Sequence, residues 1–459
     1  MRTLRDYKNF IRPKVGFRRQ VLDNLIDQTK DYFDVQRYVC LMFDEMKIKS
    51  NLVFNKHTEE LIGFTDLGDP DINYNEFDES TNKLATHTLA FYLRGISTTL
   101  KFCLANFATD NISSSQLVPI FWDAVSYLEK TCNLWVVAVT SDGASSNRSF
   151  YKIICGNKTS IPYKVKNLEA PWRYIYLFCD APHLLKTLRN ALYSSGTNLT
   201  RYLWNDGYHL LWEHISKMYY EDQERGLKLL PKITHDHIHL NSYSKMTVKF
   251  AAQVLSKTMA AVLKQYGGKE VKETAKFCDL IDSFFDCLNV RSPRNIDDRK
   301  RKPFLRPYCS VEDERFTWIT SVFLPYFKDW KSKVENRPDQ GELTKTERDK
   351  MFIPRQSYEG IVISANSLIE CVKFLLNEGM EYVLTERFCQ DPVEEYFGNQ
   401  RKLGRRSDNP DFNQYLYNDN TIRIQREVSV SSGNTRGKYD RKRAWENVTD
   451  EKLPKLKRK

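Results

Sequence analysis

Three acidic residues occur in settings where a carboxylate could take part in metal chemistry. Asp44 lies inside the apolar run VCLMFDEMKI, Asp142 follows the apolar run LWVVAVTS, and Glu394 lies in QDPVEEYFGNQRKLG. A carboxylate inside or at the tip of a buried strand is costly unless a cation or hydrogen bonds satisfy it. Three converging carboxylates would supply the oxygen ligands that Mg²⁺ and Mn²⁺ prefer. The pattern therefore suggests a two-metal site for phosphoryl transfer.

Each acid taken singly also has an ordinary explanation. Asp44 has charged neighbours, Glu45 and Lys47, and could be a surface carboxylate at a strand end. The tripeptide SDG around Asp142 is common in turns. Glu394 could be a first-turn helix residue that the helix dipole favours. The catalytic interpretation depends on the three acids meeting in space.

Strands are expected to position the first two acids. The run at 37–48 predicts a strand that carries Asp44, and the short runs NLVFN and ELIGFTDLGD predict strands beside it in an antiparallel meander. LATHTLAFYLRG and FCLANFA continue this sheet, and LWVVAVT and YIYLFC predict two further buried strands. Helical spacing of apolar residues predicts a helix over 114–132, and DAPHLLKTLRNAL predicts another that begins near Pro182. The first part of the chain is therefore an α/β mixed sheet with flanking helices.

The middle of the chain has a different, mostly helical pattern. VKFAAQVLSKTMAAVLKQYGG predicts a helix that stops at Gly267–Gly268, whereas HDHIH alternates like one face of a short strand. Glu394 lies 252 residues after Asp142, a gap that a single sheet domain does not need. The economical interpretation is a helical domain inserted before the last catalytic helix. The predicted segments are a helical N-terminal part (1–36), a first catalytic part (37–183), the insertion (184–385), a returning helix (386–425) and a basic disordered tail (426–459).

Composition favours a polyanion as partner. The chain has 459 residues and a net charge of +11, which favours nucleic acid but says nothing about fold. The ten Cys include no CxxC pair, and no signal peptide or transmembrane-length apolar stretch is visible. We therefore expect no membrane association and reduced, mostly buried thiols in a cytosolic or nuclear protein.

Four motifs occur in a fixed order and together resemble one family. FDEMKI, VTSDGASSN, FCDAPHLLKTLRN and QDPVEEYFGNQRKLG are similar to the P element-type transposases, whose members often carry an N-terminal THAP finger; no such finger precedes residue 37. The resemblance covers about residues 37–410. It implies an RNase H-like domain interrupted by a guanine-nucleotide-binding insertion. It also implies that Asp44, Asp142 and Glu394 are the catalytic acids and hold Mg²⁺ or Mn²⁺.

The same resemblance implies a GTP site in the insertion. Its expected contacts are Lys232, Val248, Phe285, Asp286, Asn289 and Asp391. Phe285 would stack on guanine, Asn289 would contact the base, and Asp286 and Asp391 would lie near the nucleotide's metal. The residues alone do not indicate GTP, because the chain has no GxxxxGK[ST] loop. Without the resemblance, Phe285 and Asn289 read as helix packing and a surface amide.

Basic residues near the acids are candidates for DNA contacts, since Lys and Arg bind phosphates. They are Arg148, Arg401, Lys402, Arg405 and Arg406, with Arg299–Lys302 and Lys455–Lys459 as looser candidates. Such short basic runs are also typical of nuclear localisation signals, so we expect a nuclear protein. His183 and Lys186 are expected to be helix-start residues that orient Asp180.

The predicted function is a DNA transposase core that cuts and joins DNA strands with divalent metal, with GTP as a possible requirement. The resemblance implies partners in DNA, a guanine nucleotide and further copies of the chain on DNA. Two alternatives remain: a domesticated descendant that binds DNA or protein without transposing, and an RNase H-fold nuclease. Cleavage and joining of terminal-repeat DNA would distinguish them.

Overall fold

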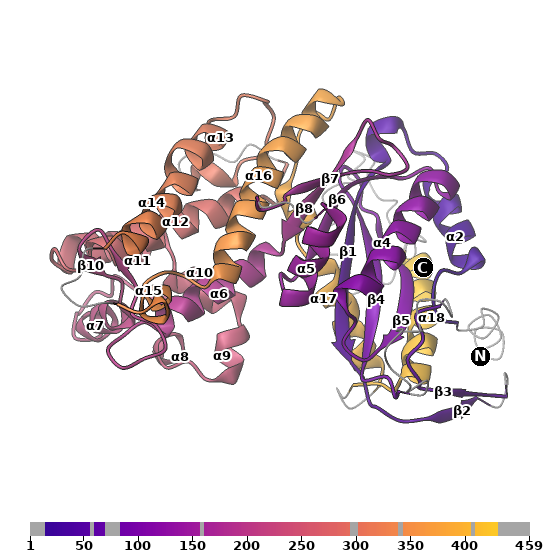
Figure 1. Cartoon of the computed structure of the whole chain (residues 1–459), viewed down its shortest axis with the longest axis horizontal. Helices are drawn as coiled ribbons and strands as arrows, with labels where there is room; N and C mark the ends of the chain where they lie inside the picture. The colour runs from indigo at the N-terminus through magenta and orange to yellow at the C-terminus, as the bar shows by residue number, and fades with distance from the viewer. Residues whose placement is uncertain are drawn as a thin grey trace, which may run out of the picture.

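A six-stranded mixed sheet forms the centre of one half of the molecule (Figure 1). The computed structural model describes residues 14–55, 59–68, 83–156, 160–293, 302–337, 343–404 and 409–429. The strands lie in the order β5-β4-β1-β6-β8-β7. The antiparallel part contains β1, β4 and β5, the parallel part β1, β6 and β8, and β7 is an antiparallel edge. The bounds are β1 (Tyr38–Lys47), β4 (His87–Gly95), β5 (Lys101–Thr109), β6 (Trp135–Ser141), β7 (Lys164–Lys166) and β8 (Tyr174–Cys179).

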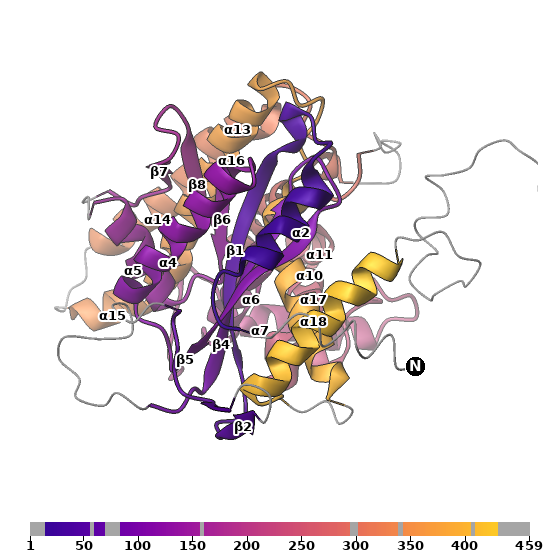
Figure 2. The same ribbon diagram turned by 90° about the vertical axis from the view of Figure 1, so that its right-hand side faces the viewer.

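Helices cover both faces of this sheet (Figure 2). Alternation along β1 sends Leu41 and Phe43 to one face and Cys40 and Met42 to the other. The first face packs against α2 (Arg19–Thr29), α4 (Ser114–Ser126) and α5 (Ser145–Ile154). The second packs against α6 (Ala181–Tyr193), α16 (Arg355–Asn377), α17 (Asp391–Leu403) and α18 (Phe412–Ser429). The predicted mixed sheet with flanking helices is confirmed.

The chain between α6 and α16 forms a second, helical half beside the sheet (Figure 1). Its helices are α7 (Trp212–Gln223), α8 (His235–Ile238), α9 (Ser242–Met246), α10 (Val248–Val254), α11 (Lys257–Tyr266), α12 (Lys272–Leu288), α13 (Glu314–Trp318), α14 (Leu324–Glu335) and α15 (Lys345–Lys350), with a small hairpin of β9 (Trp204–Asn205) and β10 (Tyr208–His209). Short helical turns of the insertion are η3 (Pro303–Leu305) and η4 (Ile319–Phe323). Outside it lie η1 (Asp34–Gln36), η2 (Tyr127–Thr131) and η5 (Thr385–Phe388). The predicted helical insertion is therefore present.

The chain rejoins the sheet along α16, upstream of the expected boundary at residue 385. The Ser364 hydroxyl accepts a hydrogen bond from the backbone N of Cys179 at 3.1 Å. The ring of Phe374 meets Tyr38 of β1 edge to face at 5.8 Å. One long helix thus belongs to both halves, because near its start the Tyr358 ring packs against Phe352 and Lys331 of the insertion, while its later turns cover the sheet.

Three local predictions were wrong. The strands β2 (Val53–Asn55) and β3 (Glu60–Ile62) form a hairpin separate from the central sheet, since β4 and β6 already pair with both edges of β1. HDHIH begins as the helical turn α8, because the Thr234 and His237 side chains cap it. The long helix expected from Val248 is divided into α10 and α11, because Ser256 is extended and its side chain caps α11 by accepting from the Met259 N.

Most of the cysteine thiols are buried, as predicted; among the described residues only Cys155 is half-buried and only Cys309 is exposed. None of the ten is in a disulfide. In the described ranges, the helices are too short or too polar to cross a membrane.

Two helical glycines differ in how much room surrounds them. A Cβ at Gly360 of α16 would lie 2.6 Å from Leu184 Cδ2 of α6, whereas a Cβ at Gly398 of α17 would meet nothing within 4 Å. Gly398→Ala should therefore raise the free energy of unfolding by about 0.5–1 kcal/mol, the usual helix-propensity gain. Gly360→Val should lower it by about 1–3 kcal/mol through overpacking of the α6–α16 contact. Urea unfolding of both variants checks this, and equal effects would contradict the close approach.

Candidate active site

Strand register brings Asp44 close to Asp142. Met42 of β1 pairs with Thr140 of the parallel strand β6, and Asp142 directly follows the end of that strand at Ser141, near enough for its charge to raise the pKa of Asp44. The Thr140 hydroxyl lies 3.4 Å from the Cys40 Sγ, so both side chains occupy one face. By alternation Asp44 faces the same way as Cys40 and Met42, toward the side that α17 covers.

The Asp142 carboxylate lies in the tight turn that follows β6. Its Oδ1 accepts hydrogen bonds from the Ala144 N at 2.8 Å and the Asn147 Nδ2 at 2.7 Å. Gly143 has φ +78°, a conformation that favours glycine at this bend. The turn chemistry considered from the sequence is therefore present, and it coexists with a position beside Asp44.

Burial and neighbouring charge make Asp44 an unusual carboxyl group. Its pKa is raised to about 7, first by burial and then by the charges of Asp142, Glu394 and Asp180. A hydrogen bond from the Glu45 N to the Asp44 Oδ1, at 2.8 Å, acts in the opposite direction. Mutual repulsion of this kind marks a place where a cation would be stabilised.

Glu394 approaches these acids from the first turn of α17, as the sequence predicts. Its backbone N donates to the Gln390 carbonyl at 3.1 Å, and α17 packs on β1 and β4. The side chain is exposed. Among the described residues, no three His, Cys, Asp or Glu side chains are placed to hold one ion. The three acids thus interact electrostatically, since the charges of Asp142 and Glu394 raise the pKa of Asp44, but they do not form a closed set of metal ligands.

Asp180 is a fourth acid of this region and is buried. It follows β8 as Asp142 follows β6, and its carboxylate accepts from the His183 N at 3.0 Å and the Gln390 N at 2.9 Å. Burial raises its pKa to about 7, with the charges of Glu394 and Asp391 adding to the effect. Sequence reasoning treated it only as the start of α6. An acid directly after the fully apolar run YIYLFC was the signal for its burial.

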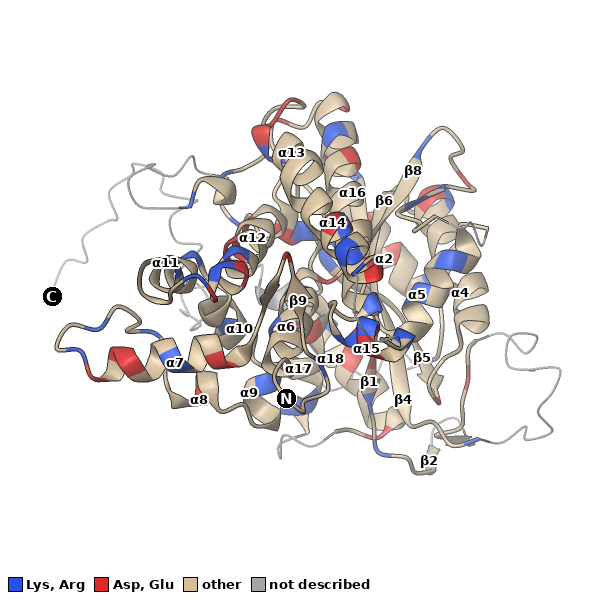
Figure 3. Ribbon diagram, turned by 60° about the vertical axis from the view of Figure 1, so that its left-hand side comes forward, with Lys and Arg blue, Asp and Glu red and all other residues tan. Residues whose placement is uncertain are grey.

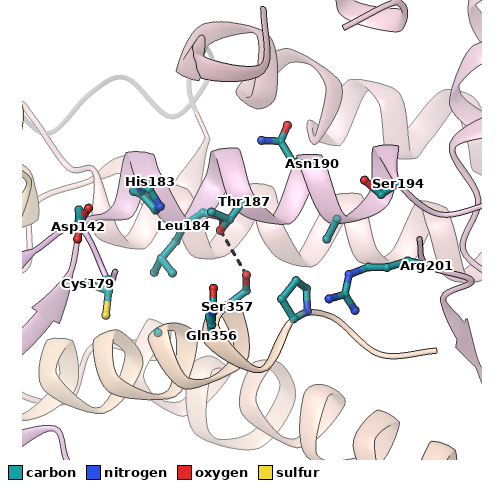
Figure 4. A pocket seen from close by; sticks show the side chains of 14 residues that line it. Asp142, Cys179, His183, Leu184, Thr187, Asn190, Ser194, Arg201, Gln356 and Ser357 are labelled. Carbon is teal, nitrogen blue, oxygen red and sulfur yellow. Dashed lines mark hydrogen bonds between the residues drawn. The ribbon is translucent and has the colours of Figure 1, made fainter. Parts of the chain in front are cut away.

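A cavity of about 280 Å³ opens beside Asp142, between α6 and the first turns of α16 (Figure 4). His183, Thr187 and Asn190 line it from α6, and Gln356 and Ser357 line it from α16. Burial lowers the pKa of His183, while the charge of Asp142 opposes that shift. The His183 backbone N therefore bonds to the Asp180 carboxylate, while its ring faces the cavity.

The residues expected to bind guanine nucleotide fall into separate places. Phe285 and Asp286 lie in the last turn of α12, and Asn289 directly follows that helix. Asp391 begins α17 and is linked to Asn289 through Arg291. The Arg291 Nε donates to the Asn289 Oδ1 at 2.9 Å, and its Nη2 donates to the Asp391 Oδ2 at 2.9 Å.

Asp286 has a cation beside it. The Lys302 Nζ lies 3.3 Å from its carboxylate and also pairs with Asp282 at 2.5 Å. Burial raises the pKa of Asp286 to about 6 against the opposing charge of Lys302. Lys232 is exposed ahead of α8, and Val248 begins α10 and packs against the core.

The basic residues expected to contact DNA differ in exposure. Arg148 is 8% exposed, and its guanidinium donates to the Gly143 carbonyl and pairs with Glu359 at 3.4 Å. It braces the Asp142 turn from within the protein. Lys402 is exposed at the end of α17, where the Arg401 Nε donates to Asn409 at 3.3 Å.

The other basic candidates are harder to place. Arg405, Arg406, 299–301 and Lys455–Lys459 lie outside the described residues, and Lys302 is paired with Asp282. Lys and Arg occur on insertion helices such as α11 as well as beside the sheet (Figure 3).

Comparison with known proteins identifies both halves. Residues 13–154 match the TNP-like RNase H N-terminal domain, and residues 182–302 match the TNP-like GTP-binding insertion domain. The chain is 29% identical over 297 residues to the transposable element P transposase of Drosophila melanogaster, covering 61% of this chain and 34% of that protein. It is 23% identical over 452 residues to the human DNA transposase THAP9, covering 93% of this chain and 46% of the relative. The chain thus spans between a third and a half of the length of these relatives.

A solved structure shares the fold. The chain resembles the Drosophila P element transposase strand transfer complex with a TM-score of 0.71 and 23% identity, over 93% of this chain and 85% of the other. The helical insertion within an RNase H-like sheet is therefore an arrangement common to both proteins.

Proposed function

We propose, from the premise that this chain belongs to the P element-type family of DNA transposases, that it is a catalytic core that cleaves and joins DNA strands. One observation of the site supports this most directly. Asp44 lies on β1 and Asp142 directly follows the neighbouring parallel strand β6, and the charges of Asp142 and Glu394 both raise the pKa of Asp44. Acids gathered on one face of a sheet are the equipment for phosphoryl transfer through metal ions.

Asp44, Asp142 and Glu394 are the residues that would hold Mg²⁺ or Mn²⁺. The donor types fit, because hard oxygen ligands suit these ions and because Asp44 is surrounded by the like charges of Asp142 and Glu394. Bound ions would activate a water or a 3′-hydroxyl and stabilise the departing oxygen. The protein itself fixes the acids: β1 and β6 hold two of them, and α17 carries the third across the sheet.

The insertion would bind a guanine nucleotide through Phe285, Asp286, Asn289 and Asp391, with Lys232 and Val248 as outer contacts. The match of 182–302 to a GTP-binding insertion domain supports this assignment. DNA would be held through phosphates by Arg401 and Lys402, which follow Glu394 by two turns of α17. We place the protein in the nucleus, as a homo-oligomer on DNA.

A reaction on defined DNA tests the proposal. Duplex oligonucleotides that end in terminal inverted repeats are incubated with the full chain, a target duplex and Mg²⁺ or Mn²⁺. Nicked and joined products support the transposase. Cleavage without joining indicates an RNase H-fold nuclease, and DNA binding without cleavage indicates a domesticated descendant.

The nucleotide assignment makes its own prediction. Phe285→Ala should weaken GTP binding by about tenfold or more, because stacking of an aromatic ring on a base contributes about 1–3 kcal/mol. Isothermal titration calorimetry measures the affinity. Phe374→Ala is the control, because Phe374 is also a half-buried phenylalanine but lies on α16 rather than α12. This variant should bind GTP like the wild type. Equal affinity in Phe285→Ala and wild type would remove Phe285 from the site.

A further inference from the structure

The stretch 385–390, which we call the return segment, touches both proposed sites. It lies between α16 and α17 in the chain, and its two ends are bonded to different halves of the molecule. Its hydrogen bonds at both ends show how a change at the end of α12 can reach the strands that carry the acids.

One end of the return segment is bonded to the end of α12. The Thr385 hydroxyl donates to the Cys287 carbonyl at 2.8 Å and accepts from the Val290 N at 3.1 Å. The Glu386 N then donates to the Val290 carbonyl at 3.2 Å. Thr385 is only 1% exposed, so water does not replace these bonds. Since Cys287 follows Asp286 and Val290 follows Asn289, Thr385 is bonded to the backbone directly beside two proposed nucleotide contacts.

The other end is bonded to the strands that carry the acids. The Phe388 carbonyl accepts from the Thr140 hydroxyl at 2.8 Å, two residues before Asp142. The Gln390 Nε2 donates to the Phe43 carbonyl at 2.9 Å, one residue before Asp44. The Phe388 ring also stacks on Phe178 of β8 at 4.5 Å.

The position of Glu394 depends on the position of Gln390, at this second end of the return segment. The Gln390 backbone N is held by the Asp180 carboxylate at 2.9 Å, and the Gln390 carbonyl accepts from the Glu394 N at 3.1 Å. Gln390 therefore begins the helix turn that carries Glu394. Any shift of Gln390 relative to β1 moves Glu394 relative to Asp44.

We propose that the return segment couples the nucleotide site to the catalytic acids, with Thr385 and Gln390 as positioning residues. A nucleotide that orders the end of α12 would order the segment through Thr385 and, through Gln390, hold Glu394 over Asp44. The inference rests on the proposed function, because it needs a nucleotide at the end of α12. Coupling of this kind is reciprocal, so bonds that favour the ordered segment also favour nucleotide binding.

Hydrogen exchange on the full chain tests the coupling without requiring DNA cleavage. Amide exchange in peptides covering 388–397 is measured with and without GTP, at one fixed Mg²⁺ concentration. GTP should slow this exchange about fivefold or more in the wild type, the low end of ordinary allosteric coupling, and less than about twofold in Thr385→Val. Thr385→Ser keeps the hydroxyl and should restore the effect.

Thr274→Val is the matched control. Thr274 is also a buried threonine, on α12 itself, and its hydroxyl bonds to His214 at 2.8 Å away from the return segment. It should keep the wild-type response to GTP. If Thr385→Val does not fold, Gln390→Ala breaks the link at its other end and should lose the response in the same way.

The outcomes separate this proposal from the proposed function. Bound GTP with unchanged exchange at 388–397 overturns the coupling alone, as does an equal response in wild type and Thr385→Val. A wild type that binds no GTP in calorimetry overturns both the coupling and the nucleotide site. GTP-dependent protection that requires Thr385, in a protein that does not cleave DNA, supports the coupling and removes the cleavage activity.

Discussion

Replacement of Asp44, Asp142 or Glu394 by its amide should lower Mg²⁺-dependent DNA cleavage by about a thousandfold or more. Each change removes a charged metal ligand, and metal ions stabilise the transition state by several kcal/mol. Each loss of about 1.4 kcal/mol of that stabilisation slows the reaction tenfold. The side-chain shapes are kept, so DNA binding should stay within about twofold of wild type. Gel-based cleavage assays and fluorescence anisotropy with the same terminal-repeat duplex measure the two properties.

Glu395→Gln is the control for Glu394→Gln. Glu395 is the next residue on α17, and its exposed carboxylate pairs with Lys101 at 2.8 Å, on another side of the helix. An exposed pair of this kind contributes little, so cleavage by Glu395→Gln should resemble wild type. Equal losses in both variants would show a general disturbance of α17, and full activity in all three amide variants would refute the catalytic assignment.

Asp44→Asn should make the protein more stable at pH 8 in the absence of divalent metal. The pKa of Asp44 rises from 3.8 to about 7 on folding, so the folded chain holds a proton there that the unfolded chain releases. Stability from this group is therefore fully present below about pH 4 and is lost as the pH rises through about 7. At about 1.4 kcal/mol per pKa unit, the amide should recover between about 1 and 4 kcal/mol at pH 8. The gain should vanish at pH 4.

Urea unfolding at the two pH values measures this difference. Asp23→Asn, at an exposed aspartate on α2, is the control and should change stability by less than about 0.5 kcal/mol at either pH. Added Mg²⁺ should stabilise the wild type more than Asp44→Asn, because a bound cation relieves the same repulsion. A less stable Asp44→Asn at pH 8 would contradict a repulsive cluster of acids.

Local patterns placed the three acids correctly relative to their elements. Apolar runs identified β1 and β6, and the motif QDPVEEYFG identified the start of α17, because strand burial and helix starts depend on near neighbours. The 252-residue gap also indicated the insertion before any contact was known. Local patterns failed at HDHIH and at the β2–β3 hairpin, where capping and strand pairing outweighed alternation.

Long-range contacts could not be obtained in the same way. Arg148 looks like a free basic residue in sequence, yet the structure buries it against Glu359, more than 200 positions away. Asp180 looks like a simple helix cap, yet it also holds Gln390.

By itself, the sequence indicated a family resemblance, most of the elements and three candidate acids, since these depend on residue types and spacing along the chain. Only the tertiary structure decided that Asp142 lies close to Asp44, that the buried Asp180 carboxylate holds the Gln390 N, and that Thr385 bonds the segment before α17 to the end of α12. The physical reason is that strand register, burial and the partners of a hydrogen bond belong to pairs of distant segments. Neither segment encodes them alone.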